Sequence, residues 1–244
     1  MKRFLGALLL ASAASAQGAT ELPRILDLAG QRVEALDRAV GEMSWRVQSV
    51  MTQWNEPEGT KPSKVVLTER RTRLRRPDLL TNEVFAMVID GNRLGPDELR
   101  RELKKPQPGG PGGVPENPFS PKCRARYDFE MKGTERVGGR KAYRVGFTCR
   151  ETSEKYYHGE ALLFADTGDQ VSLTLWPSKL PLFLSKLRIQ VDCGPVSFAG
   201  QTFYLGQRMR LDLRVQVKFL VSLADIRVSV AEENTDYQFL PPGR

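Results

Sequence analysis

The sequence predicts a mainly β protein, in which a strongly curved antiparallel sheet forms an incomplete β-barrel with a helical lid. Three observations lead to this fold class. Apolar and polar residues alternate with a period of two through most of the chain, the connections between these runs are short and rich in turn residues, and two stretches show helical spacing. The runs add up to about ten meandering strands, enough to enclose a ligand if the sheet curves.

The first 16 residues have the features of a secretory signal peptide. Lys2 and Arg3 provide a positive start, an apolar run extends from Phe4 to Leu10, and Ala14-Ser15-Ala16 has the small-x-small pattern of a cleavage site. The apolar run is shorter than the roughly 20 residues that span a bilayer, and no cysteine near Ala16 could carry a lipid anchor. We therefore expect an exported, periplasmic protein that is cleaved near Ala16, with residues 17–244 as a single domain.

An amphipathic helix is predicted from Leu22 to Val40, and Gly41 ends it. Its apolar residues lie at helical spacing: Ile25, Leu28, Ala29, Val33, Leu36 and Val40. Alternation with a period of two follows. It predicts strands over Trp45 to Ser49, over Lys64 to Leu74, and over Val84 to Ile89, which the Asp90-Gly91 turn closes.

A change of composition comes next. Pro96 opens a short helix that is predicted to end near Lys104 and that carries Leu99 and Leu103. The following stretch from Pro106 to Pro121 is rich in Pro and Gly, which excludes regular structure and predicts a mobile loop that is dispensable for folding. A linker between two domains is the alternative, but the strands before it are too few to close a core of their own.

The second half of the chain is a series of predicted strands with short connections. The clearest alternation runs without a break from Leu211 to Phe219, with one apolar and one polar face, as in a strand that is half buried in an antiparallel sheet. The Gly138-Gly139 pair marks a turn between the first two strands. The other predicted strands are Tyr127 to Met131, Tyr143 to Thr148, Ala161 to Ala165, Val171 to Trp176, Lys186 to Val191 and Ile226 to Val230.

Three cysteines enter an oxidising compartment if the chain is exported, which predicts one disulfide and one free thiol. Cys123 and Cys149 lie at the outer ends of a predicted hairpin and could face each other. A bridge from Cys149 to Cys193 is the alternative that the sequence leaves open.

Residues that carry catalysis are scarce, and we predict neither an enzyme nor a cofactor. His158 is the single histidine, so metal sites with several histidines are excluded. Glu232 and Glu233 are neighbours on a strand and point to opposite faces, which excludes them as a paired acid and base. The sequence also contains no phosphate-binding loop, no G-x-S-x-G and no cysteine pair at zinc spacing.

A basic run extends from Arg70 to Arg76, and on a strand Arg71, Arg73 and Arg75 would share one face. That face could contact phosphates or acidic headgroups, or it could be a solvated strand face. Aromatic residues are not interleaved with the arginines, so nucleic acid is not predicted as a partner. The mature chain carries 35 basic and 29 acidic residues, and this modest excess is compatible with peripheral contact to a membrane.

The apolar stretch Leu180-Pro181-Leu182-Phe183-Leu184 lies between two predicted strands. An apolar loop lowers solubility unless it packs against something. Two alternatives follow: the loop is tucked into the core, or it forms the rim of a hydrophobic cavity.

The order of these elements resembles that of the LolA-like periplasmic lipoprotein carriers, the outer membrane lipoprotein-sorting superfamily, and their RseB- and MucB-type relatives. The resemblance lies in the amphipathic first helix, the segment Val137 to Val145, the segment Gly159 to Gly168 that leads into Val171, and the closing Thr235-Asp236-Tyr237-Gln238-Phe239. It implies an incomplete β-barrel whose concave apolar face is covered by helices and takes up acyl chains.

Together these features predict a non-enzymatic envelope protein that binds lipid or lipid-modified protein, as a carrier or a sensor. The alternatives are a structural or protein-interaction module of the envelope with a filled core and a protein partner, and a hydrolase, which would need a cleft with convergent polar groups. The candidate ligand-binding residues are Leu99, Leu103, Leu173, Leu175, Leu182, Phe183, Leu213, Val215 and Val217.

Overall fold

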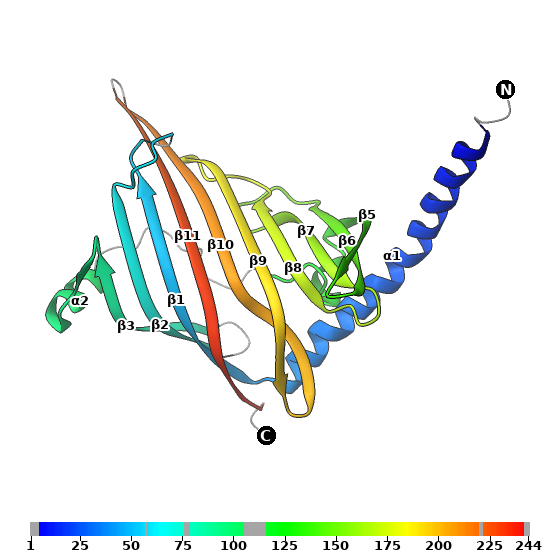
Figure 1. Ribbon diagram of the computed structural model, residues 1–244, viewed down its shortest axis with the longest axis horizontal. Helices are drawn as coiled ribbons and strands as arrows, with labels where there is room; N and C mark the ends of the chain where they lie inside the picture. The colour runs from blue at the N-terminus through cyan, green and yellow to red at the C-terminus, as the bar shows by residue number, and fades with distance from the viewer. Residues whose placement is uncertain (1–4, 57, 76–78, 105–115, 220–221, 242–244) are drawn as a thin grey trace.

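The computed structural model describes residues 5–56, 58–75, 79–104, 116–219 and 222–241. These residues form one antiparallel sheet of eleven strands in the order β4-β3-β2-β1-β11-β10-β9-β8-β7-β6-β5, and the sheet is not closed (Figure 1). The predicted fold class is therefore confirmed. The strands are β1 Glu42–Trp54, β2 Lys64–Arg75, β3 Leu79–Ile89, β4 Asn92–Arg93, β5 Tyr127–Val137, β6 Arg140–Cys149, β7 Tyr157–Phe164, β8 Gln170–Pro177, β9 Leu184–Phe198, β10 Gln201–Phe219 and β11 Ser222–Leu240.

The two halves of the chain meet in the middle of the sheet, because β1 pairs with β11 from Glu42↔Leu240 to Trp54↔Arg227. Strands β5 to β11 form a meander, and β1 to β4 extend the sheet from its last strand in the opposite direction. The connection from β4 to β5 therefore joins the two edges of the sheet. The sequence predicted a meander but not this pairing of the first and last strands.

Tight turns lie where glycine-containing pairs predicted them. Asp90 and Gly91 have φ values of 50° and 85°, and Gly138 and Gly139 have 56° and 81°, the left-handed conformation that two-residue hairpin turns require. A further left-handed pair, Ala199 (φ 49°) and Gly200 (φ 74°), separates β9 from β10 and was not predicted.

Both predicted helices are present, and a third was missed. Helix α1 spans Leu5–Ala39 and is continuous through Pro23, so it includes most of the segment predicted as a signal peptide. Helix α2 spans Pro96–Leu103 and α3 spans Pro121–Arg124. None of the described helices is long and apolar enough to cross a membrane.

The main core lies between α1 and strands β5 to β8. Ile25 and Ala29 of α1 are buried in it, together with Phe119 from the segment before α3, which is 1% exposed. Other members are Leu26, Tyr127, Tyr143, Val145, Phe147, Cys149, Tyr157, Ala161, Leu163, Ala165 and Leu175. The helix thus covers one end of the sheet only.

Phe119 lies near the end of the segment from Pro106 to Pro121 that was predicted as a loop, and its side chain is buried in the core. Its ring centroid lies 5.8 Å from that of Phe129 and 5.7 Å from that of Phe147. Burial of this aromatic ring holds the end of the segment against the core. Residues 105–115 lie outside the described residues.

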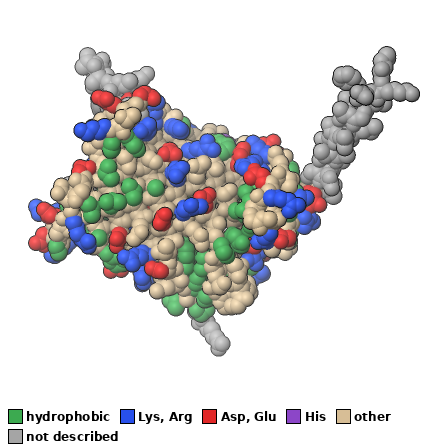
Figure 2. Space-filling model, viewed as in Figure 1, with side chains coloured by type: hydrophobic (Ala, Val, Ile, Leu, Met, Phe, Trp, Pro, Cys, Tyr) green, Lys and Arg blue, Asp and Glu red, His purple; other side chains and the backbone are tan. Residues whose placement is uncertain are grey.

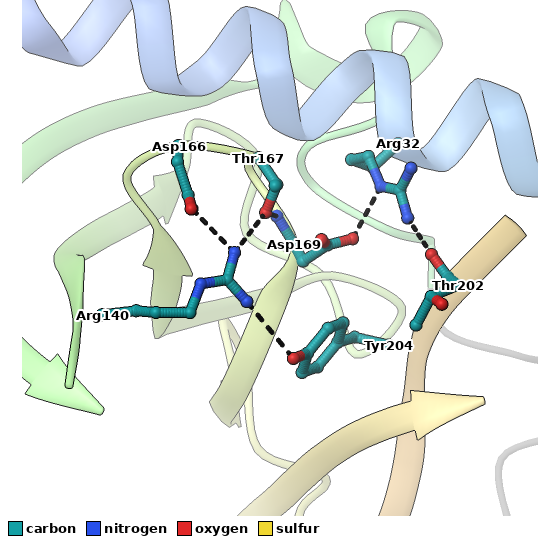
Figure 3. A network of polar contacts seen from close by, with 7 residues as sticks. All are labelled: Arg32, Arg140, Asp166, Thr167, Asp169, Thr202 and Tyr204. Carbon is teal, nitrogen blue, oxygen red and sulfur yellow. Dashed lines mark hydrogen bonds and ion pairs between the residues drawn. The ribbon is translucent and has the colours of Figure 1, made fainter. Parts of the chain in front are cut away.

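Polar contacts hold α1 against the sheet (Figure 3). Arg32 donates from Nε to Asp169 Oδ1 at 2.6 Å and also donates to the carbonyl of Thr202 at the start of β10. Asp169 is 7% exposed, so this charge pair is largely removed from water. The helix is thereby tied both to the β7–β8 turn and to β10.

A second arginine stabilises the same turn from the other side. Arg140 donates to Asp166 at 2.8 Å and to Thr167 at 3.3 Å (Figure 3). Its guanidinium also lies 3.7 Å above the ring of Phe164. This hydrogen bond from Arg140 lowers the pKa of Asp166. The turn therefore presents a fixed surface to α1.

Gly168 lets the helix approach this turn. Its φ is +74°, and a Cβ added there would lie 2.5 Å from the backbone of Leu28 and Ala29. Only glycine combines this left-handed conformation with a backbone contact so close.

All three cysteines are free thiols in the described residues, so the structure does not show the predicted disulfide. Cys149 at the end of β6 stands opposite Tyr127 in β5, whereas Cys123 lies in α3, so the hairpin does not bring Cys123 and Cys149 into register. Cys193 in β9 is separated from β6 by β7 and β8, which also excludes the alternative pairing.

Candidate ligand-binding face

Directly paired residues form a continuous row across one face of the sheet. Paired residues on neighbouring strands point to the same face, so register alone identifies the members. In the described residues this row crosses ten strands and contains one glycine and nine apolar side chains. From β3 to β5 its members are Ile89, Val66, Met51, Val230, Leu211, Ile189, Leu175, Gly159, Phe147 and Phe129.

Neighbouring positions on the same face extend the apolar surface along the strands. Leu213 pairs with Leu187 and with Val228, and Val215 pairs with Ile226. Because side chains alternate along a strand, these residues point to the same side as Leu211.

The helix-covered core occupies only part of this face. Leu175 is buried beneath α1, and Leu173 and Ile189 form the partly buried margin of that core. Beyond this margin most of the apolar side chains are only half buried, although Val66 in β2 is 8% exposed. We call this part the uncovered apolar face, and its members are Met51, Leu187, Leu211, Leu213, Val215, Ile226, Val228 and Val230.

An ion pair borders the uncovered apolar face on the same side of the sheet. Arg70 donates to Glu232 at 2.6 Å, and their side chains are 21% and 11% exposed. Glu232 stands directly opposite Ser49 and Met209 in the neighbouring strands. Removing both charges from most of their water is costly, and the pairing compensates part of this cost. The face therefore combines a wide apolar area with one polar end.

The opposite face of the same strands carries charged side chains beside exposed apolar ones, since Val50 and Leu67, which pair directly, are 39% and 42% exposed. Arg214 binds Asp225 through two hydrogen bonds of 2.8 and 2.6 Å, and this contact lowers the pKa of Asp225. Arg227 lies over the ring of Trp54 at 4.0 Å. Figure 2 shows acidic and basic side chains interspersed over the surface in view, without a large area of one sign.

The bulge in β10 and the end of β11 shape the sheet beside this area. Asn234 donates to the carbonyl of Gly206 at 2.8 Å, and the Tyr237 hydroxyl donates to the same oxygen at 2.5 Å. The Tyr237 ring stacks on Trp45 at 5.9 Å, and burial raises the pKa of its hydroxyl. The closing Tyr-containing segment therefore anchors β11 between β1 and β10.

The predicted ligand-binding residues on β8 and β10 divide between the two parts of the face. Leu213 and Val215 lie on the uncovered apolar face, whereas Leu175 belongs to the core under α1 and Leu173 to its margin. Val217 lies near the end of β10, and its side chain is outside the described set.

The remaining predicted residues are not members of this face. Leu99 is half buried and Leu103 is exposed on α2, which has no buried residue between Pro96 and Leu103. Leu182 and Phe183 are exposed in the β8–β9 connection, so the alternative in which this loop is tucked into the core is wrong for these two side chains.

Several members of the uncovered apolar face were missed as site residues. Val228, Leu187 and Leu211 lie in runs whose alternation was recognised, and Met51 lies just beyond a predicted strand. Alternation indicates which side chains share a face of one strand, but only the register of the sheet shows which strands are neighbours.

Other groups considered for chemistry have structural partners. The Nδ1 atom of His158 accepts a hydrogen bond from the backbone N–H of Cys149 at 3.1 Å. Arg73 pairs with Glu42 at 3.2 Å and Arg71 donates to Gln238 at 3.3 Å, as expected for a solvated strand face. The described residues contain no cluster of His, Cys, Asp and Glu that could hold a metal ion.

Comparison with known proteins shows likeness in structure only. No protein-family model matches the sequence, and no curated protein matches it. A putative outer membrane lipoprotein-sorting protein domain from Vibrio parahaemolyticus is similar, with a TM-score of 0.43, 9% identity, and coverage of 90% of this chain and 93% of that one. A LolA superfamily protein from Nitrosomonas europaea has a TM-score of 0.35, 9% identity, and coverage of 89% and 93%.

A third similar structure is the Pseudomonas aeruginosa MucA/MucB complex, with a TM-score of 0.24, 14% identity, and coverage of 93% of this chain and 100% of that one. The resemblance noted in the sequence thus recurs among the structural neighbours. At these TM-scores the likeness carries no argument about what this protein binds.

Proposed function

We propose that this protein is a non-enzymatic, exported protein of the cell envelope that binds acyl chains of lipids or lipid-modified proteins, as a carrier or a sensor. The observation that carries this proposal is the uncovered apolar face, which continues the apolar row of the core beyond the reach of α1. A soluble protein that leaves such an area half exposed has an apolar ligand or partner to cover it.

The dimensions of the face suit an acyl chain. From β1 to β9 it crosses four strands, and neighbouring strands lie about 4.8 Å apart, so the face is about 14 Å wide. Each methylene removed from water contributes about 0.8 kcal/mol, so eight buried methylenes contribute about 6 kcal/mol. That gain is sufficient for specific binding without a closed cavity.

The polar end of the face gives such a ligand an orientation. The acyl chain lies on the apolar residues, and an ester or carboxylate at its head lies beside Arg70 and Ser49. Charge-assisted hydrogen bonds from an arginine are stronger than those between neutral groups. No bond of the ligand is made or broken in this scheme.

Binding is tested with delipidated protein and a fluorescent long-chain fatty acid added from dilute solution. We expect saturable binding at about one ligand per chain. Val228→Asn places a polar amide on the uncovered apolar face and should weaken binding about tenfold, which corresponds to about 1.4 kcal/mol.

Val50→Asn is the matched control, because Val50 is 39% exposed and its neighbour Met51 points to the uncovered apolar face. The control should fold and bind as the unaltered protein does. Equal loss in both variants, or no saturable binding by the unaltered protein, would overturn the proposal. Capture of a protein segment instead of a lipid on this face would favour the protein-interaction module.

A further inference from the structure

The β8–β9 connection, residues 178–183, holds apolar side chains out in solvent. Leu182 is 104% exposed, Phe183 is 56% exposed and Leu180 is 37% exposed. Single exposed apolar residues are common on soluble proteins, but three within four positions form a continuous apolar tip. We call Leu180, Leu182 and Phe183 the apolar tip.

Hydrogen bonds at both ends fix this connection. At its start the Ser178 hydroxyl donates to the carbonyl of Ser153 at 2.8 Å and accepts from the backbone N–H of Ser153 at 2.9 Å. At its end the backbone N–H of Gln216 in β10 donates to the carbonyl of Phe183 at 2.8 Å. The connection is thus an anchored turn that presents its apolar side chains outward.

Basic residues flank the apolar tip. Lys179 and Lys186 are exposed, and neither forms an ion pair with any residue that the structure describes. Glu154 and Lys155 lie in the neighbouring connection between β6 and β7 and are also exposed. Their charges cancel, so the two lysines beside the tip leave an excess of positive charge. An apolar tip between cations complements the surface of a bilayer that contains anionic lipids.

The apolar tip lies at one end of the uncovered apolar face. Leu184, the first residue of β9, stands opposite Val215, and the antiparallel order places the β8–β9 connection at the same end of the sheet as the β10–β11 hairpin and the β1–β2 connection (Figure 1). A path along Leu184 and Leu187 therefore joins the tip to the rest of that face.

We infer that the apolar tip is a membrane-docking element. Leu180, Leu182 and Phe183 insert into the interfacial layer of an anionic bilayer, and Lys179 and Lys186 contact its headgroups. An acyl chain then passes from the bilayer to the uncovered apolar face without crossing water. This last step rests on the proposed function, whereas the docking itself does not.

The test is flotation of the full mature chain with vesicles of equal parts phosphatidylglycerol and phosphatidylcholine. The double variant Leu182→Ser/Phe183→Ser should float at least about tenfold less, and Lys179→Glu/Lys186→Glu should lose the part of binding that high salt also removes. The matched control is Leu79→Ser/Phe85→Ser, which removes the same residue types, 58% and 47% exposed, from β3. This control should float as the unaltered protein does.

Failure to float, or equal loss in the tip and control variants, would overturn the inference. A dimer that the tip substitutions dissociate, in a protein that does not bind vesicles, would assign the tip to a second copy of the chain and also overturn it. Fatty acid supplied from solution should bind the tip variant normally. If the unaltered protein binds vesicles but does not bind fatty acid, the proposed function is refuted and the docking inference stands.

Discussion

The contact between helix α1 and the β7–β8 turn decides how much of the sheet is covered, and Gly168→Ala tests it. Gly168 has a φ of +74°, and an added Cβ would lie 2.5 Å from the backbone of Leu28 and Ala29. A backbone contact this short cannot be relieved by turning a side chain, so either the turn or the helix must move.

The expected cost has two parts. Alanine in the left-handed conformation costs about 1–2 kcal/mol relative to glycine, and forcing an extra methyl group into a packed contact costs about 1–3 kcal/mol. We therefore expect Gly168→Ala to lower the free energy of unfolding by about 2–5 kcal/mol. For a chain of this size that corresponds to a decrease of about 4–20 °C in the melting temperature.

Gly200→Ala separates the two parts of this cost. Gly200 has the same φ of +74° but no heavy atom within 4 Å of an added Cβ. Its replacement should cost the conformational part alone, about 1–2 kcal/mol. Both variants also change the entropy of the unfolded chain equally, so their difference measures the contact with the helix.

The assay is denaturant unfolding followed by tryptophan fluorescence and by circular dichroism. The reasoning fails if Gly168→Ala and Gly200→Ala lose the same free energy of unfolding, because α1 would then not rest on the turn. If α1 moves in Gly168→Ala, the affinity for fatty acid should change in that variant. Gly200→Ala should bind with the affinity of the unaltered protein.

Three further predictions concern the core and the thiols. Phe119→Ala should lower the free energy of unfolding by about 3–5 kcal/mol in denaturant titration; a neutral result would support the prediction that the whole segment from Pro106 to Pro121 is dispensable. Thiol titration after unfolding without reductant should find three free thiols, and a count of one would instead demonstrate a disulfide. In the native protein at pH 8 the thiols should react slowly, because Cys149 is 5% exposed and burial raises the pKa of Cys193 to about 11. The free energy of unfolding should fall as the pH rises from 9 to 11, since the Cys193 thiol loses its proton near pH 9.0 in the unfolded chain and keeps it to about pH 11 in the folded one. The loss is at most about 2.7 kcal/mol. An equally steep fall with pH in Cys193→Ala would contradict this assignment.

Local sequence patterns predicted most of the elements. The unbroken alternation from Leu211 to Phe219 marks a strand because a period of two places every second side chain on one face. Helical spacing from Leu22 to Val40 and the Gly138-Gly139 turn are equally local signals, and the structure contains both. Some strands are longer than predicted, as in Asp192 to Phe198 of β9, where Gly194 and Pro195 interrupt the alternation that the prediction relied on.

Long-range contacts were beyond these patterns. Nothing in β1 or β11 indicates that the first and last strands are partners, because backbone hydrogen bonds in a ladder do not depend on side-chain identity. The burial of Phe119 in a Pro- and Gly-rich segment likewise depends on rings in β5 and β6 that lie far along the chain.

The sequence alone determined that the chain forms a one-sided apolar sheet with few helices, since hydrophobic periodicity is a property of each strand. It could not determine which part of that sheet is covered. Leu175 and Leu213 have the same alternating pattern, yet Leu175 is buried under α1 and Leu213 is half exposed. Only the tertiary structure decided between them, because one helix docks at Gly168 and Asp169 and is too narrow to cover the strands beyond Ile189.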